Sequence, residues 1–99
     1  MKRLPLLCLA LFAPLAQADI KLAQSKNCMA CHAVNTKILG PSFKDVAAKY
    51  AKNPKAVDLL ANKIIKGGKG VWGEIPMPAS ANVSPEEAKR LATWVLATK

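Results

Sequence analysis

The sequence is poor in histidine, cysteine and aromatic residues. Its 99 residues include one histidine, His32, with three cysteines and five aromatic side chains. A structural zinc site needs about four ligands, and Cys8 is the only cysteine or histidine outside residues 28–32, so such a site is disfavoured. Nucleic-acid binding is disfavoured too, because no aromatics are interleaved with the basic residues. There are no repeats, no low-complexity stretches and no strand pattern.

The chemistry that is present lies in Cys28-Met-Ala-Cys31-His32, the pattern of c-type haem attachment. The thiols of Cys28 and Cys31 can add to the haem vinyl groups as thioethers, and His32 can bind one face of the iron. A redox dithiol, half a zinc site and a disulfide are the alternatives. A thioredoxin-like dithiol needs a βαβ context that the sequence lacks. The pattern therefore predicts one covalent haem c with its iron.

The first eighteen residues have the organisation of a cleaved secretory signal. Lys2 and Arg3 precede a twelve-residue apolar run at 4–15, and Ala16-Gln17-Ala18 is a small-x-small cleavage site. An uncleaved anchor is the alternative, but a bilayer span needs roughly 20 residues and this run contains two prolines. We expect export to the periplasm, loss of Cys8 with the signal, and a mature domain at residues 19–99.

The mature chain is strongly basic. Loss of Lys2 and Arg3 leaves 13 basic residues against 6 acidic ones, a net charge of +7. The lysines are either a solvated surface or a field that steers redox partners with acidic docking surfaces. The remaining 81 residues bury only a modest core. A covalent haem would complete that core, so we expect the haem-free chain to be poorly folded.

Periodicity and capping residues predict four helices and no sheet. The first is expected from Asp19, as its cap, to about Met29. A loop at 33–41 follows, and Ser42 begins the second helix, with an apolar stripe of Phe43, Val46, Ala47 and Tyr50.

The third predicted helix is capped by Asn53, begins at Pro54 and ends at Gly67-Gly68. Its apolar residues are Val57, Leu60, Ala61, Ile64 and Ile65. A loop at 69–83 leads to the last helix, where Ser84 and Glu87 form a capping box around Pro85. The apolar face of this helix consists of Ala88, Leu91, Trp94 and Val95.

Met77 is the candidate for the second axial position. Without the signal, Met29 and Met77 are the only methionines, and the haem tethers would hold the Met29 sulfur away from the iron. Prolines on both sides of Met77 stiffen the loop that presents it. A gap-filling core methionine, lysine ligation and an open site remain alternatives. A Met/His pair raises the haem potential and closes the iron to substrates, as an electron carrier requires.

Apolar and aromatic residues elsewhere are candidates for the haem surroundings. The indole N–H of Trp72 either donates to a haem propionate or belongs to simple packing, and Trp94 is expected in the core. The predicted apolar wall consists of Val34, Ile38, Phe43, Leu60, Ile64 and Ile75.

The chain resembles the small class I bacterial cytochromes c of the periplasm, the short type of denitrifying pseudomonads and ammonia oxidisers. The resemblance covers nearly all of the mature chain and is most specific at residues 28–32, 39–50, 70–78 and 92–96. It implies a four-helix class I cytochrome c fold around one covalent haem, with the first and last helices packed together. The expected function is a soluble, monomeric electron carrier that serves a periplasmic nitrite reductase, a peroxidase or a membrane oxidase.

The resemblance also implies roles for single residues. His32 and Met77 would be the axial ligands, the Pro41 carbonyl would accept a hydrogen bond from His32 Nδ1, and Trp72 would reach a propionate. Electrons would cross at a haem edge ringed by lysines. Relatives commonly carry an asparagine that bonds the methionine sulfur. Here Ser80 takes its place and Asn82 follows two residues later, so which of them meets the sulfur stays open.

Two other functions, a peroxidase and a sensor, fit the sequence less well than the carrier. A small peroxidase would need a distal acid–base group, and the mature chain offers no second histidine for it. A gas or redox sensor would normally need an output domain, and the sequence ends at Lys99, just after the last predicted helix.

Overall fold

The computed structural model describes residues 15–99, and most of the predicted signal, including Cys8, lies outside the described residues. The elements are α1 (Leu15–Ser25), a short 3-10 helix η1 (Cys28–Ala30), α2 (Phe43–Lys49), α3 (Ala56–Lys66) and α4 (Pro85–Leu96). Within residues 15–99 the only β-type pairings are two isolated bridges, so the prediction of four helices and no sheet is confirmed. In this part of the chain, no helix combines the length and the apolar character that crossing a membrane requires.

The bounds predicted for the first helix were wrong at both ends. Helix α1 begins at Leu15, so Asp19 lies inside it and does not cap it. Its carboxylate instead accepts a hydrogen bond from Arg90 Nη2 of α4 at 2.9 Å. The helix ends at Ser25 because Asn27 adopts a left-handed conformation, with φ of 66°, which asparagine tolerates better than most residues. The two haem-motif cysteines therefore begin and follow the separate turn η1.

The start predicted for the third helix was also wrong. Its N-cap is Lys55, two residues beyond Asn53. The Asn53 side chain accepts a hydrogen bond from the Lys55 backbone N–H at 2.8 Å, the pattern of an Asx turn. Asn53 therefore stabilises the turn before the helix. The end of α3 agrees with the prediction, because Gly67 is its C-cap, with φ of 75°.

The predicted caps of the other two helices are confirmed. Ser42 Oγ accepts the Asp45 backbone N–H at 3.1 Å at the start of α2. At α4, Ser84 Oγ accepts the Glu87 N–H at 3.1 Å, and Glu87 Oε1 accepts the Ser84 N–H at 3.0 Å. This reciprocal pair is the predicted capping box, and α4 begins at Pro85, as the sequence predicts.

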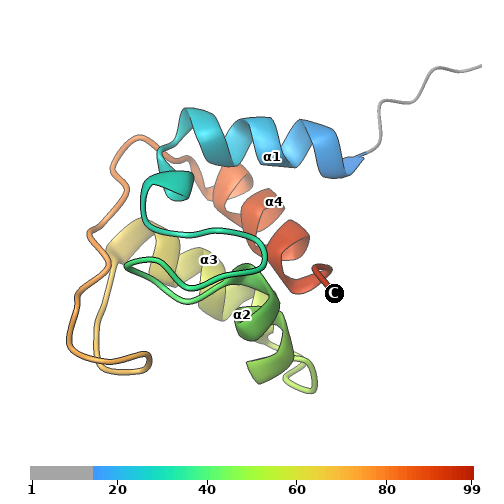
Figure 1. Cartoon of the computed structure of the whole chain (residues 1–99). Helices are drawn as coiled ribbons and strands as arrows, with labels where there is room; N and C mark the ends of the chain where they lie inside the picture. The colour runs from blue at the N-terminus through green and yellow to red at the C-terminus, as the bar shows by residue number, and fades with distance from the viewer. Residues whose placement is uncertain (1–14) are drawn as a thin grey trace, which may run out of the picture.

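Helix α4 is the centre of the fold, because it contacts all three other helices and most extensively α3. Figure 1 shows α1 crossing above α4, with α2 and α3 below. Ala23 of α1 packs with Ala88, Leu91 and Ala92 of α4 in one buried cluster, so the implied contact of first and last helices is present. A second cluster joins Phe43 and Val46 of α2 to α4. Trp94 is only half-buried and packs against both clusters.

Lys26 ties the end of α1 to the start of α4. Its Nζ donates to the Asn82 carbonyl at 2.7 Å and lies 3.4 Å from Glu87 Oε1. The pKa of Glu87 is lowered, first by the hydrogen bond from the Ser84 backbone and then by Lys26. A carboxylate with a lowered pKa in the folded state stabilises that state above its unfolded pKa of about 4.3, and this contribution is lost as the pH falls through the folded pKa.

Replacement of Glu87 by glutamine should therefore lower stability at neutral pH more than in acid. We expect the difference in guanidinium midpoint between the parent protein and Glu87→Gln to shrink as the pH falls below about 4.3. Glu86→Gln is the matched control, since it removes the same charge from the same first turn of α4 without touching the capping box. A difference that stays constant down to the acid limit, or equals that of the control, would contradict the assigned role.

Candidate functional site

One large cavity lies between the helices and the two long loops. Its volume is about 580 Å³, within the range of roughly 300–1,000 Å³ typical of ligand and cofactor pockets. Residues from all four helices, η1 and the loops at 33–41 and 67–83 line it, including Cys28, Cys31, His32 and Met77. The structure therefore brings the four candidate attachment and ligand residues to one space.

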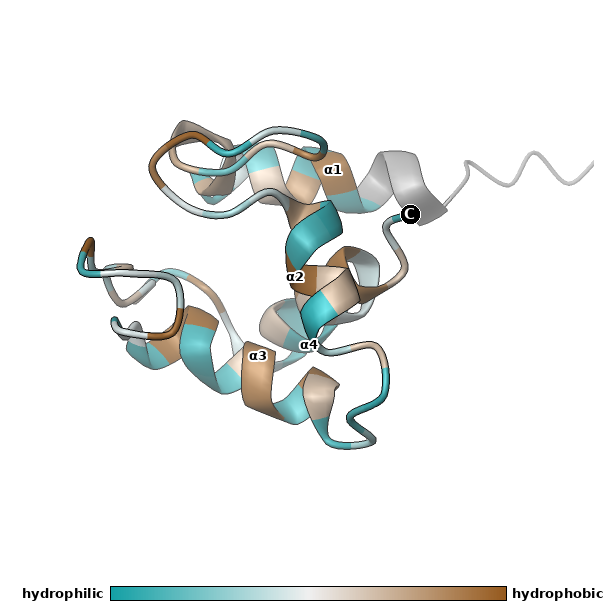
Figure 2. Cartoon of the chain, turned by 60° about the horizontal axis from the view of Figure 1, so that its bottom comes forward, coloured by the Kyte–Doolittle hydropathy of each residue, from teal (hydrophilic) through white to brown (hydrophobic). Residues whose placement is uncertain are grey.

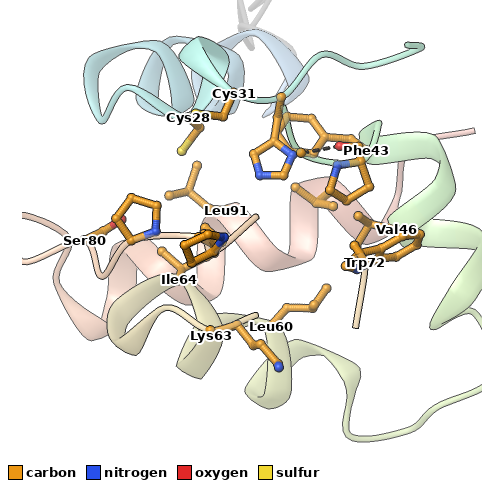
Figure 3. Close-up of a pocket in the computed structure, with 18 of the residues that line it drawn as sticks. Cys28, Cys31, Phe43, Val46, Leu60, Lys63, Ile64, Trp72, Ser80 and Leu91 are labelled. Atoms are coloured by element: carbon orange, nitrogen blue, oxygen red, sulfur yellow. Dashed lines mark hydrogen bonds between the residues drawn. The ribbon is translucent and has the colours of Figure 1, made fainter. Parts of the chain in front are cut away.

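The two cysteines form one wall of this cavity. Figure 3 shows Cys28 and Cys31 on the side facing Leu60 and Ile64 of α3, with the Cys28 sulfur directed into the space. Both thiols are free, and burial raises the pKa of Cys28. A dithiol oxidoreductase needs the opposite shift, toward the thiolate, so this environment disfavours a redox role for the pair. Among residues 15–99 no group of three or more histidine, cysteine or acidic side chains is placed to hold a metal ion.

His32 is held in the tautomer that a metal ligand requires. Its Nδ1 lies 2.7 Å from the Pro41 carbonyl oxygen, the contact drawn as a dashed line in Figure 3. Because a carbonyl can only accept, Nδ1 carries the proton and donates it, and in the neutral imidazole this leaves Nε2 with a free lone pair. The ring also stacks on Phe43, with centroids 5.1 Å apart. The imidazole is therefore oriented by its neighbours, as metal-binding histidines usually are.

Met77 is presented by a loop whose base is fixed by backbone pairing. The Met77 N–H donates to the Gly68 carbonyl at 2.7 Å, and the Gly68 N–H donates to the Met77 carbonyl at 3.0 Å. Gly67 has a positive φ, and a Cβ there would lie 2.5 Å from the Met77 carbonyl oxygen. This glycine is therefore needed for both conformation and space. Met77 is half-buried and lines the cavity, with Pro76 and Pro78 beside it.

Trp72 lies at the cavity, where it is 42 % exposed. It belongs to the turn closed by the hydrogen bond from Gly70 N–H to the Gly73 carbonyl, at 2.9 Å. Lys49, the last residue of α2, places Nζ 5.6 Å from the centroid of the Trp72 ring and 6.0 Å from that of Tyr50. This cation–π contact joins the loop to α2 and brings a positive charge near the indole.

Four of the six predicted wall residues line the cavity: Phe43, Leu60, Ile64 and Ile75. The prediction was wrong for Val34 and Ile38. Val34 packs against the Phe43 cluster, and Ile38 is 50 % exposed on the 33–41 loop. The neighbouring Leu39 lines the cavity in place of Ile38. The sequence could not identify which residue of the loop faces inward, because a loop has no helical or strand period.

Several lining residues were missed from the sequence, notably the polar side chains of Lys26, Lys63 and Lys69. Lys63 follows Leu60 by three residues on α3, so helical spacing could have found it. Figure 3 shows Lys63 beside Leu60 at the edge of the cavity.

Ser80 and Asn82 both line the cavity, so the structure does not choose between them as neighbours of the Met77 sulfur. The Ser80 backbone N–H donates to the Ile64 carbonyl at 3.1 Å, which anchors this loop to α3.

The cavity fits a covalently attached haem. Its walls are mainly apolar, as a flat macrocycle requires, while two thiols and an oriented imidazole meet at one side. An all-α domain with these features is a c-type haem protein. Residues 20–99 match the sequence model of the cytochrome c family, and the chain belongs to that family. The family implies one covalent haem c with its iron, and the homologues of this chain are cytochromes c, which are electron carriers rather than enzymes.

Individual relatives agree with this assignment. The chain is 55% identical to cytochrome c-552 of Nitrosomonas europaea over 89 residues, which cover 90% of this chain and 86% of the relative. It is 50% identical to cytochrome c-552 of Hydrogenobacter thermophilus over the full length of both. The crystal structure of the Nitrosomonas europaea cytochrome c552 superimposes with a TM-score of 0.79 at 54% identity, covering 81% of this chain and 99% of that one. The class I four-helix fold is confirmed.

Proposed function

We propose that this chain is a soluble periplasmic electron carrier with one haem c, held by thioethers from Cys28 and Cys31 and ligated axially by His32 and Met77. The observation that carries the proposal is the convergence of these four side chains on one cavity. The haem supplies a one-electron change between ferric and ferrous iron. Cleavage of the signal after Ala18 would leave the mature domain at residues 19–99.

The protein's own residues would adjust the reduction potential of the haem iron. The Pro41 carbonyl holds the proton on His32 Nδ1 and so keeps Nε2 available to the iron. Apolar side chains such as Leu60 and Ile64 exclude water, and a low dielectric disfavours the extra charge of the ferric state. Trp72 would donate to a propionate. The exclusion of water and a thioether ligand both raise the potential.

The proposed ligation is tested by the spectra of the purified protein. We expect low-spin iron in both oxidation states and, in the ferric state, the weak far-red band of sulfur bound to iron. A ferric spectrum without that band would count against Met77. Release of haem from the denatured protein by acid extraction would count against the thioethers.

Electrons would cross at the mouth of the cavity, between the loops at 33–41 and 67–83. Figure 2 shows hydrophobic segments in both loops, away from the C-terminus. The large apolar side chains exposed there are Ile38, Leu39, Val71, Trp72 and Ile75. Basic residues border the same space, with Lys69 exposed at the loop and Lys63 half-buried beside it. An apolar contact area with positive charge around it suits a brief encounter with an acidic redox partner such as a periplasmic reductase.

Charge near the mouth should control the rate of that encounter. We expect Lys69→Gln to slow second-order electron transfer to an acidic partner at low ionic strength, and the difference to disappear at high salt because salt screens exposed charges. The matched control is Lys99→Gln, which removes an exposed positive charge at the C-terminus from a residue that does not line the cavity. Stopped-flow measurements of the electron-transfer rates of the parent protein and both variants, over a series of salt concentrations, test this expectation. A flat salt response of the parent protein would contradict electrostatic steering.

A further inference from the structure

Gly40 lies directly against the imidazole of His32. A Cβ built on Gly40 would lie 2.5 Å from His32 Cε1, 2.9 Å from Nδ1 and 3.0 Å from Nε2. An atom in the ring plane beyond Cε1 would be much farther from the two nitrogens than from that carbon. The added carbon would therefore lie over the face of the imidazole, well inside the 3.5–4.0 Å at which carbon atoms pack favourably.

The requirement for glycine at this position is one of space. Gly67, Gly68, Gly70 and Gly73 have positive φ values, and Gly40 is not among them. An alanine could therefore adopt the backbone conformation of Gly40, but its methyl group would overlap the ring. Gly40 cannot easily retreat, because its N–H donates to the Cys31 carbonyl at 2.7 Å and its carbonyl accepts the Ile38 N–H at 3.2 Å.

The other restraints on the ring act in different ways. The Pro41 carbonyl fixes the position of Nδ1, but a single hydrogen bond leaves the ring free to rotate about that contact. Phe43 stacks on the ring at an interplanar angle of 23°, which limits that rotation on the side where the two rings meet. Gly40 adds a third restraint, since its Cα is one bond from the point over the ring face near Cε1 that a Cβ would occupy.

We propose that Gly40 is a positioning residue that sets the plane of the His32 imidazole, by letting the ring lie flat against the backbone of the 33–41 loop. The inference rests on the proposed ligation of the iron by His32. The plane of an axial imidazole determines how the iron d orbitals split, and second-shell contacts are the usual means of fixing it. Gly40 would therefore determine the magnetic properties of the ferric haem and contribute to its potential.

The test compares ferric Gly40→Ala with the parent holoprotein by low-temperature electron paramagnetic resonance and by proton NMR of the haem methyl groups. We expect the variant to remain low-spin, with a shifted largest g value and a changed spread of methyl resonances. Val83→Ala is the control for general destabilisation, because Val83 is buried in the core and does not line the cavity. It should lose stability without either spectral shift. A Gly40→Ala variant with parental spectra would overturn the proposal.

A measurement on the parent protein covers the case in which the variant does not fold. In the ferrous, diamagnetic state we expect a strong nuclear Overhauser effect between a Gly40 Hα and His32 Hε1, with that Hα shifted by the imidazole ring current. Absence of this effect would overturn the proposal whatever the variant does. High-spin iron in the parent would instead contradict the ligation by His32 and Met77, so the two failures are distinguishable.

Discussion

The haem-free double variant Cys28→Ala/Cys31→Ala should lack a cooperative unfolding transition. Without thioethers the domain would have to fold around a cavity of about 580 Å³. At about 24 cal/mol per Å³, a dry cavity of this size would cost roughly 14 kcal/mol, close to the upper end of the roughly 5–15 kcal/mol that stabilises a whole domain. The short helices cannot compensate, because helices of 7 to 12 residues are marginal without tertiary packing.

Differential scanning calorimetry and circular dichroism measure this outcome directly. We expect no heat-absorption peak and a weak helical signal from the haem-free chain. Met29→Leu is the matched control, since it changes the same short segment, keeps both thiols and should retain haem and the transition. A native-like cooperative peak from the haem-free double variant would show that the helices form a core by themselves, and would contradict the prediction.

Replacement of Met77 by alanine should open the haem iron to external ligands. We expect Met77→Ala to lose the far-red ferric band, to bind cyanide and carbon monoxide rapidly, and to have a lower potential. The decrease should be on the order of 0.1–0.2 V, part of the roughly 0.8 V over which axial ligands set haem potentials. The cause is the loss of a thioether, which favours ferrous iron.

Met29→Leu is again the matched control, because Met29 is the other methionine among residues 15–99. It packs against both core clusters, so its loss should affect stability more than ligand binding. If Met77→Ala keeps the far-red band and resists cyanide, Met77 is not the ligand. The unmodified protein decides between the functional classes as well. Rapid binding of cyanide or carbon monoxide to it would contradict a closed carrier site and favour a peroxidase or a sensor.

The helix ends differ in how far local sequence signals determine them. Ser42 and Ser84 were predicted as caps and act as caps, because each needs only a side-chain oxygen and a backbone N–H three residues away. Asp19 and Asn53 carry equally good capping side chains but make other bonds. Asp19 pairs with Arg90, which is 71 residues away, so no local pattern could have revealed its partner.

In the loops too, local spacing predicts some features, and others depend on tertiary packing. The positions of Cys28, Cys31 and His32 within one five-residue pattern predicted their chemistry from spacing alone, since attachment of haem depends on adjacent groups. The inward direction of Leu39, and not Ile38, depends on how the 33–41 loop packs. The close approach of Gly40 to His32 likewise becomes visible only when the loop closes through the bond between Gly40 and Cys31.

The sequence by itself determined the class of protein, the four helices and the candidate haem residues. These follow from short-range spacing, helical periodicity and the scarcity of histidine and methionine, which left few possible ligands. The resemblance implied that Met77 and His32 meet at one haem and that His32 Nδ1 bonds the Pro41 carbonyl, whereas only the tertiary structure decided that Leu39 lines the cavity and that Gly40 lies against the His32 ring. The physical reason is that these contacts join segments through loops without a regular period, so they depend on packing against α3 and α4.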